Sequence, residues 1–282
     1  MRNAIDPIFQ SLKWIVAVMH RRVGGMGILA PLIAGICAGC TTEPISIDLE
    51  RSRAALAMNE YADAQAAAET YLAGDPSGPR AAEANYLKGR ALEDRTAATA
   101  DEARDNLQGA RTAYVAALTA GTQDRALEGL IRASLADVAY WQEDFAVAAE
   151  QGNAAYGLLS DDDARAWTLY RTGVAQQRMG SFEEADKSLN AVQTQHPGSE
   201  PASRARPRTG VRAFSVQAAT FAQASIADSA IASLTQQGFS VTKRLNDSGK
   251  TVIMVGPYQS YAQASGVRTR LAAKYPDAMI VP

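Results

Sequence analysis

The side chains that most often carry catalysis or bind metal ions are scarce in this chain. Its 282 residues contain two histidines, His20 and His196, and two cysteines, Cys37 and Cys40. A structural zinc site takes four cysteine or histidine ligands. Of the four residues here, only the two cysteines are close to each other in the sequence, so the spacing typical of a zinc site is missing. We therefore expect no metal, no cofactor and no catalytic centre based on histidine.

Clusters of carboxylates are the other candidates for acid–base chemistry. Asp161, Asp162 and Asp163 are consecutive, as are Glu183 and Glu184, and a glycosidase uses a pair of such groups. Both clusters stand where a helix is expected to begin, and carboxylates there usually cap the helix or face solvent. The sequence also lacks the nucleophile-elbow, zinc-protease and phosphate-loop motifs. The chain is therefore predicted not to be an enzyme.

The N-terminal segment has the pattern of an export signal. Residues 23–39 carry no charge and follow His20-Arg21-Arg22, which is the order of a signal peptide. The run ends in Ala38-Gly39-Cys40 and resembles the lipobox of bacterial lipoproteins, in which the cysteine is lipidated. In that family the threonine after Cys40 implies sorting to the outer membrane.

Two alternatives concern this segment. Translation from Met19 would give a signal peptide of ordinary proportions, and we expect Met19 to be the true start. The run of 17 residues is also at the lower limit for a spanning helix, and its glycines and Pro31 weaken it as a helix. An uncleaved inner-membrane anchor is the alternative to a lipoprotein.

Charge divides the remaining chain into unlike parts. The formal net charge is −2, but residues 1–40 carry +3, residues 41–200 carry −12 and residues 201–282 carry +7. The length suits about two domains, and a hydrophobic content of 47% is that of a folded protein. The acidic middle argues against binding to nucleic acid. We expect two different modules, with an interaction surface on the basic one.

Residues 45–200 are alanine-rich and amphipathic, which predicts helices. Residues 166–199 resemble a tetratricopeptide repeat through Gly173, Gly180, Phe182, Ala185, Leu189, Val192 and Pro197. Weaker copies occupy residues 45–78, 81–123 and 129–162, and about nine extra residues fall near 95–103. The resemblance implies an α-helical solenoid whose concave face binds a protein partner. A helical spacer without a ligand is the alternative.

Beyond a predicted linker at 201–212, the pattern becomes that of a small α+β domain. Strands are predicted at 214–220, 239–245, 251–255 and 278–281, and helices at 223–237 and 260–274. The order βαββαβ is a ferredoxin-like topology, in which both helices cover one face of the sheet. The opposite face is open and is the natural binding platform. An RNA-recognition module of the same topology is excluded, because its aromatic signature is missing from 251–255.

Two segments of this domain resemble a known family. FSVQAATF at 214–221 and VIMVGPY at 252–258 resemble the two signatures of the SPOR domain, the sporulation-related repeat. The resemblance covers residues 213–282 and implies binding to peptidoglycan, with a preference for glycan strands stripped of their stem peptides at the division site. Where the family commonly has an aromatic residue and an arginine, this chain has Thr251 and Val252.

Six residues of these segments are the predicted glycan site. Gln217 offers an amide to sugar hydroxyl or N-acetyl groups, and the hydroxyl groups of Ser215 and Thr220 lie near it. Val252 and Met254 are expected to be exposed on the open face. Tyr258 either stacks on a sugar ring or packs beneath a helix. The predicted site residues are Gln217, Ser215, Thr220, Val252, Met254 and Tyr258.

Together these patterns predict an envelope protein that binds and tethers. The expected order is a signal peptide at 1–39, a lipidated tether at 40–44, helical repeats at 45–200, a linker at 201–212 and a SPOR domain at 213–282. The lipid would hold the protein at the periplasmic face of the outer membrane, with the repeats binding a protein and the C-terminal domain binding glycan strands. The alternative is an outer-membrane assembly scaffold whose C-terminal domain binds protein instead of glycan.

Overall fold

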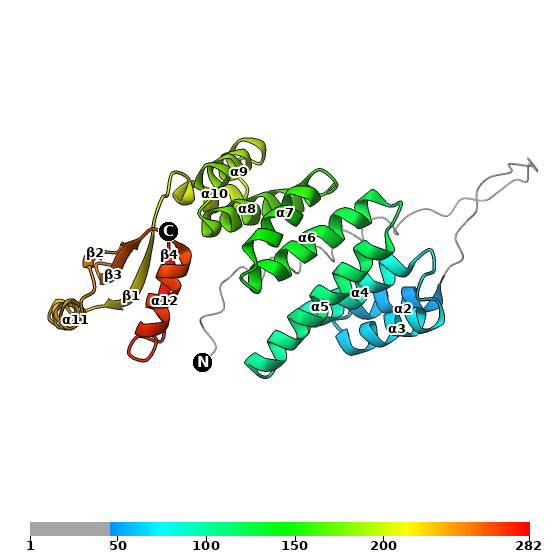
Figure 1. Cartoon of the computed structure of the whole chain (residues 1–282), viewed down its shortest axis with the longest axis horizontal. Helices are drawn as coiled ribbons and strands as arrows, with labels where there is room; N and C mark the ends of the chain where they lie inside the picture. Colours follow the sequence, from blue (N-terminus) through cyan, green and yellow to red (C-terminus); the bar gives the residue numbers. More distant parts are fainter. Residues whose placement is uncertain (1–45) are drawn as a thin grey trace, which may run out of the picture. The chain divides into compact units, whose positions relative to one another are not determined.

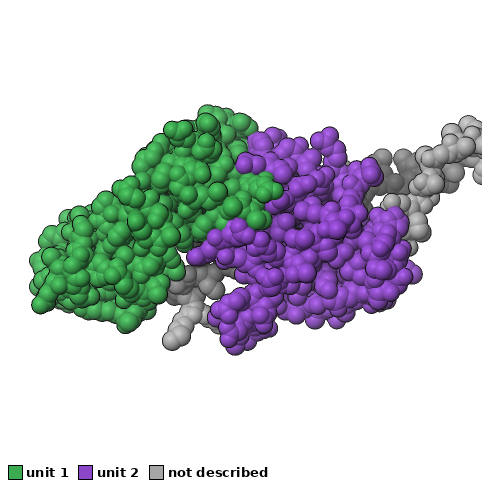
Figure 2. All heavy atoms as spheres, viewed as in Figure 1, with its two compact units in different colours: residues 1–4, 145–150, 166–282 green, residues 5–144, 151–165 purple. Residues whose placement is uncertain are grey.

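The computed structural model describes residues 46–282, which form two compact units (Figure 2). The N-terminal unit comprises residues 46–144 and 151–165, and the C-terminal unit comprises 145–150 and 166–282. The expected signal peptide, Met19 and Cys40 lie outside the described residues. No helix within 46–282 is long and apolar enough to cross a membrane.

The chain from residue 47 to residue 205 is helical, as predicted, with two helices for each of the four expected repeats (Figure 1). The helices are α2 (Ile47–Ala57), α3 (Tyr61–Gly74), α4 (Ala81–Asp94), α5 (Ala100–Ala120), α6 (Arg125–Trp141), α7 (Phe145–Tyr156), α8 (Asp162–Met179), α9 (Phe182–Gln195) and α10 (Glu200–Ala205). The helical prediction is confirmed, whereas the tetratricopeptide resemblance stays a prediction.

In the N-terminal unit each helix packs against the next, from α2 to α6. Glycine permits the closest of these approaches: a Cβ atom at Gly89 in α4 would lie 2.4 Å from the ring of Tyr114 in α5. The extra residues expected near 95–103 mostly extend α5 at its N-terminus, so this helix has 21 residues and the preceding loop is short. The insertion is therefore accommodated as helix, because Thr99 caps a new start by accepting a hydrogen bond from the backbone of Glu102.

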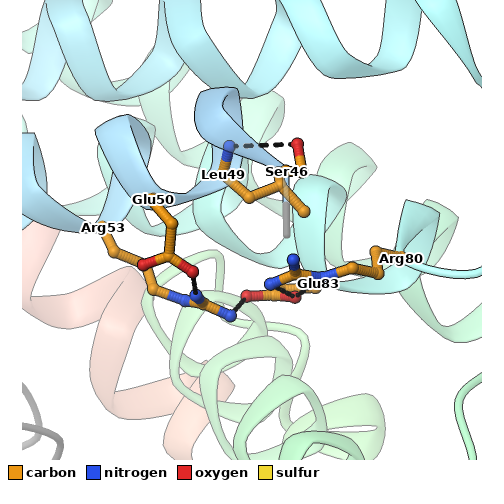
Figure 3. A network of polar contacts seen from close by, with 6 residues as sticks. All are labelled: Ser46, Leu49, Glu50, Arg53, Arg80 and Glu83. Atoms are coloured by element: carbon orange, nitrogen blue, oxygen red, sulfur yellow. Dashed lines mark hydrogen bonds and ion pairs between the residues drawn. The ribbon is translucent and has the colours of Figure 1, made fainter. Parts of the chain in front are cut away.

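A polar network fixes the first helix of this unit (Figure 3). Ser46 is the N-cap of α2 and accepts a hydrogen bond from the Leu49 backbone. Arg53 of α2 forms ion pairs with Glu50 in the same helix and with Glu83 in α4. Arg80 binds the other oxygen of Glu83 at 2.8 Å. Since Glu83 is largely buried between two arginines, it joins α2 to the start of α4.

The segment predicted as a linker, 201–212, is partly helical. It contains α10 and a 3₁₀ turn, η2 (Arg206–Arg208), which both pack on α9. Gln177 of α8 donates a hydrogen bond to the Arg208 carbonyl, and Asp186 of α9 accepts one from the Gly210 backbone. The segment is ordered because these helices satisfy its backbone groups, a contribution that composition alone does not reveal.

The four strands form one antiparallel sheet in the order β2-β3-β1-β4, as the ferredoxin-like prediction requires. Its elements are β1 (Phe214–Phe221), α11 (Ala224–Gln236), β2 (Val241–Leu245), β3 (Thr251–Tyr258), α12 (Tyr261–Leu271) and β4 (Met279–Val281). The third strand continues through Gly256 and Pro257, where the sequence had predicted its end. Asn246 closes the β2–β3 turn by accepting hydrogen bonds from the backbones of Ser248 and Lys250.

Both helices pack on the same face of this sheet. The core takes Val216 from β1 and Val255 from β3, with Leu234 from α11 and Val267 from α12. Phe182 of α9 also reaches this core, with its ring centroid 6.2 Å from that of Phe214. Helix α9 and the sheet of the C-terminal unit are therefore joined by apolar contacts.

Candidate binding face of the sheet

The alternation of side chains gives the sheet one apolar face and one free face. On β1, Phe214, Val216 and Ala218 are buried against the helices, while Ser215 and Gln217 point to the opposite side. A shift of register between Gln217 and Ala219 adds one residue to β1, so Ala219 pairs with the buried Ile253. Thr220 consequently returns to the free face.

The register places the residues of this free face in rows across the strands, because directly paired residues share a face. The central row is Thr242, Met254, Gln217 and Met279, one residue from each strand. The second row is Arg244, Val252 and Thr220, and a third contains Ser215 and Val281. All four strands thus contribute to one surface.

Four of the six predicted site residues lie on this face with accessible side chains. Ser215, Gln217 and Met254 are partly buried and Thr220 is exposed. Among residues 46–282 the Gln217 amide has no hydrogen-bond partner, so its donors and its acceptor are free for a ligand. The structure therefore brings Gln217, Ser215, Thr220 and Met254 together.

Val252 was expected to be exposed, and this expectation is wrong. Its side chain is on the free face but is only 3% exposed. Val252 is in a central strand, with Thr220 on one side and Arg244 on the other. A short branched side chain between two neighbouring strands is shielded by them, so Val252 supports the face and offers little contact area.

Tyr258 lies on the helix side of the sheet, so its place among the glycan-binding residues is not supported. It pairs with the buried Phe214 and packs against the core. Burial raises the pKa of the Tyr258 hydroxyl, against the opposing effect of Arg270. Gly256 (φ +130°) makes this arrangement possible, because a Cβ there would lie 3.2 Å from the Tyr258 ring. Of the two predicted roles, the structure shows packing beneath a helix.

Three accessible residues of the face were missed from the sequence. Met279 is 51% exposed and is paired with Gln217, while Thr242 and Arg244 are exposed on β2. The sequence shows the alternation of side chains along β2 and β4, but it does not show which of these residues lie beside Gln217. That information requires the strand order together with the register.

The face combines hydrogen-bonding groups with apolar ones. The Gln217 amide stands between the side chains of Met254 and Met279, and hydroxyl groups are supplied by Ser215 and Thr220 of the same strand and by Thr242 of β2. No strand residue of this described face is an aspartate, glutamate, histidine or cysteine. The surface can therefore bind a ligand that has both polar and apolar sides, but it lacks an acid–base pair.

The carboxylate clusters lie at the N-terminal ends of helices α8 and α9. Asp161 accepts a hydrogen bond of 2.8 Å from the Ala164 backbone and so caps α8. Glu183 and Glu184 are in the first turn of α9, where acidic residues complement the helix dipole. Within 46–282, no three histidine, cysteine, aspartate or glutamate side chains are placed so that they could hold a metal ion together.

Comparison with known proteins defines the class of the C-terminal part. Residues 210–282 match the family model described as the SPOR domain. The chain therefore carries a SPOR domain at its C-terminal end, and this domain indicates binding to peptidoglycan. No curated protein matches the chain.

Proposed function

We propose that the chain binds the glycan strands of peptidoglycan through the free face of its SPOR sheet. The observation that carries this proposal is the central row, in which an unpaired amide stands between two accessible methionines. An amino sugar presents apolar C–H groups on its ring faces and polar hydroxyl and N-acetyl groups around its edge. Methionine side chains contact the ring faces, and the Gln217 amide binds an N-acetyl or hydroxyl group.

The preferred substrate in this proposal is glycan without stem peptides. The central row crosses three strand spacings of about 4.8 Å, or about 14 Å in total. A sugar chain lying along the row would therefore contact all four strands. Stem peptides branching from such a chain would compete with it for the same face, which favours denuded strands.

Co-sedimentation tests this proposal directly. The full chain in detergent micelles is mixed with purified peptidoglycan, either intact or treated with an amidase that removes the stem peptides. We expect binding to both forms, with higher affinity for the treated one. If the chain sediments with neither form, the proposed function is wrong.

A pair of glutamine variants locates the site. Gln217→Ala removes the central amide and is expected to weaken binding by about twofold to tenfold, the range of one net hydrogen bond. Gln236→Ala on α11 is the matched control, since Gln236 is exposed on a helix that covers the opposite face. Equal binding by wild type and Gln217→Ala would place the site elsewhere.

The remainder of the chain is proposed to attach this domain to the envelope. A lipid on Cys40 would hold the protein at the periplasmic face of the outer membrane, which the export pattern at 23–40 supports. The helical region, with its excess of acidic residues, would bind a protein partner. In this proposal the protein is a non-enzymatic adaptor between membrane, wall and partner.

The accessible methionines also favour the alternative, in which the SPOR sheet binds protein within an assembly scaffold. Met254 and Met279 lie on either side of Gln217, and flexible thioethers adapt to many partners. The co-sedimentation experiment separates the two functions, because only glycan binding predicts retention by peptidoglycan from which the peptides have been removed.

A further inference from the structure

Arg244 is the charged residue that the strands place on the free face. It is exposed on β2, opposite Val252, in the row next to Gln217. The neighbouring Lys243 points to the helix side instead, where it binds Asp228 of α11 at 2.7 Å. The two adjacent cations of β2 therefore serve opposite faces of the sheet.

The guanidinium group of Arg244 is free to bind an anion. Among residues 46–282 no hydrogen bond or ion pair involves the side chain of Arg244. Other cations of the domain are engaged on the helix side: Arg270 lies over the Phe239 ring and Lys274 binds Ser233. Since no carboxylate stands on the strands of the free face, an anion there would meet Arg244 without a competing negative charge.

The proposed substrate supplies such an anion after one specific chemical change. In intact peptidoglycan the lactyl carboxyl group of N-acetylmuramic acid is joined to the stem peptide as a neutral amide. Hydrolysis of that amide removes the peptide and leaves a lactyl carboxylate on the sugar. A denuded strand is therefore a regular polyanion, with its charges next to the rings.

We propose that Arg244 determines the specificity for denuded glycan by binding this lactyl carboxylate. The inference rests on the proposed glycan-binding function and adds the group that is recognised. A guanidinium ion binds a carboxylate through two parallel hydrogen bonds, which neither Gln217 nor the methionines can provide. In the register, Arg244 is one row and two strands from Gln217, because β3 lies between β1 and β2. Two strand spacings are about 10 Å, so a sugar chain held at Gln217 and extending over β3 brings a lactyl group of a following sugar to the arginine side chain.

Three preparations of glycan distinguish the lactyl carboxylate from the carboxylates of stem peptides. The first is intact peptidoglycan, the second is the amidase-treated form, and the third is the treated form with its lactyl carboxylates converted to methylamides. Binding of the full chain is measured for wild type, Arg244→Gln and Arg244→Lys. Lys243→Gln is the control, because it removes the same charge from the other face of the same strand.

We expect Arg244→Gln to weaken binding to the treated form by about threefold to tenfold and to leave binding to the methylamide form unchanged. Arg244→Lys should retain part of the affinity, and Lys243→Gln should bind like wild type. A larger loss on intact peptidoglycan, or an equal loss on all three forms, would overturn the inference. Unchanged binding by Arg244→Gln would do so as well, whereas failure of wild type to bind any form refutes the proposed function itself.

Discussion

At the scale of single residues, Gly89 shows how a missing side chain sets the distance between two helices. The Tyr114 ring of α5 occupies the space next to Gly89 in α4 and is fully buried. Such an approach is possible only where one partner has no Cβ. Gly89 lies in the weaker repeat copy predicted at 81–123, and the structure shows that Tyr114 is its packing partner.

Replacing Gly89 with alanine is therefore expected to destabilise the N-terminal unit. The new methyl group would lie 2.4 Å from a ring carbon of Tyr114, and relieving that overlap costs about 1–3 kcal/mol. Urea unfolding followed by circular dichroism measures the change. Gly74→Ala is the control, because no atom lies within 4 Å of a Cβ there, and a stability loss of the same size in both variants would contradict the packing argument.

A second residue-scale feature is the buried carboxyl group of Glu93 in α4. The Tyr114 hydroxyl donates a hydrogen bond to it, and Arg90 is nearby but binds Asp94 at 2.6 Å. Burial, reinforced by Asp94 and Asp137 and opposed by Arg90, raises the pKa of Glu93 to about 8. Since Arg90 is paired with Asp94, the Glu93 carboxyl group keeps its proton and is neutral at pH 7.

This shift predicts that stability falls as the pH rises. Between the ordinary pKa of 4.5 and the folded value of about 8, the unfolded chain has lost the Glu93 proton while the folded chain retains it. The free energy of unfolding then decreases by up to about 1.4 kcal/mol for each pH unit. Urea unfolding of wild type and Glu93→Gln at pH 5, 6, 7 and 8 measures this dependence.

The glutamine variant should show a smaller decrease over this window, because it has no proton to release. Asp63→Asn, at an exposed carboxyl on α3, serves as the control and should keep the slope of wild type. If Glu93→Gln and wild type had parallel pH profiles, the neutral state of Glu93 would be refuted.

At the scale of elements, the segment that leads into the SPOR sheet is held by one carboxylate. Asp186 of α9 accepts hydrogen bonds from the Gly210 backbone at 2.8 Å and from Arg212 at 2.6 Å. Although partial burial acts in the opposite direction, these hydrogen bonds lower the pKa of Asp186. Asp186 therefore holds residues 210–212 against helix α9.

Removing this carboxylate should loosen the segment without unfolding the helices. We expect Asp186→Ala to accelerate trypsin cleavage after Arg204, Arg208 and Arg212 by several-fold, because local opening exposes the backbone to the protease. Mass spectrometry of the fragments identifies the cleaved bond. Glu183→Ala, on an exposed residue of the same helix, should be cleaved at the wild-type rate, and identical rates for both variants would contradict the role of Asp186.

Most elements could be predicted from the sequence because each has a local signal. Helix period, alternation and the Asn246 turn depend on neighbouring residues, and they gave the ferredoxin-like order correctly. The site was predicted less well, because Val252, Tyr258 and Met279 depend on which strands are adjacent. The Ala218–Ala219 irregularity and the ordered 201–212 segment likewise depend on contacts distant in sequence.

At the scale of the whole molecule, opposite charge excesses are confined to different parts of the chain. Residues 41–200 carry −12 and residues 201–282 carry +7. The basic end suits the polyanionic strand proposed as its ligand, so added salt should weaken that binding. In that proposal the acidic helices would repel the same polyanion and so favour its binding at the SPOR sheet.

The proposed lipid on Cys40 can be tested by following lipid labelling and membrane attachment of the protein. In a bacterial host, Cys40→Ser should abolish labelling by a radioactive fatty acid and move the protein to the soluble fraction. Cys37→Ser is the matched control and should still be labelled, because the resemblance to the lipobox places the lipid on Cys40. Labelling that persists in Cys40→Ser, or that depends on Cys37, would disprove the lipoprotein proposal.

The central row also has an evolutionary consequence. Thr242, Met254, Gln217 and Met279 come from four strands, and the residues that hold the fold point to the other side. A substitution at an exposed position of this row, such as Thr242 or Met279, should therefore change stability by only about 0.5 kcal/mol or less. Ligand binding and folding then depend on different residues of the same strands. Descendants of this chain can acquire new ligand preferences one strand at a time without first acquiring a compensating core.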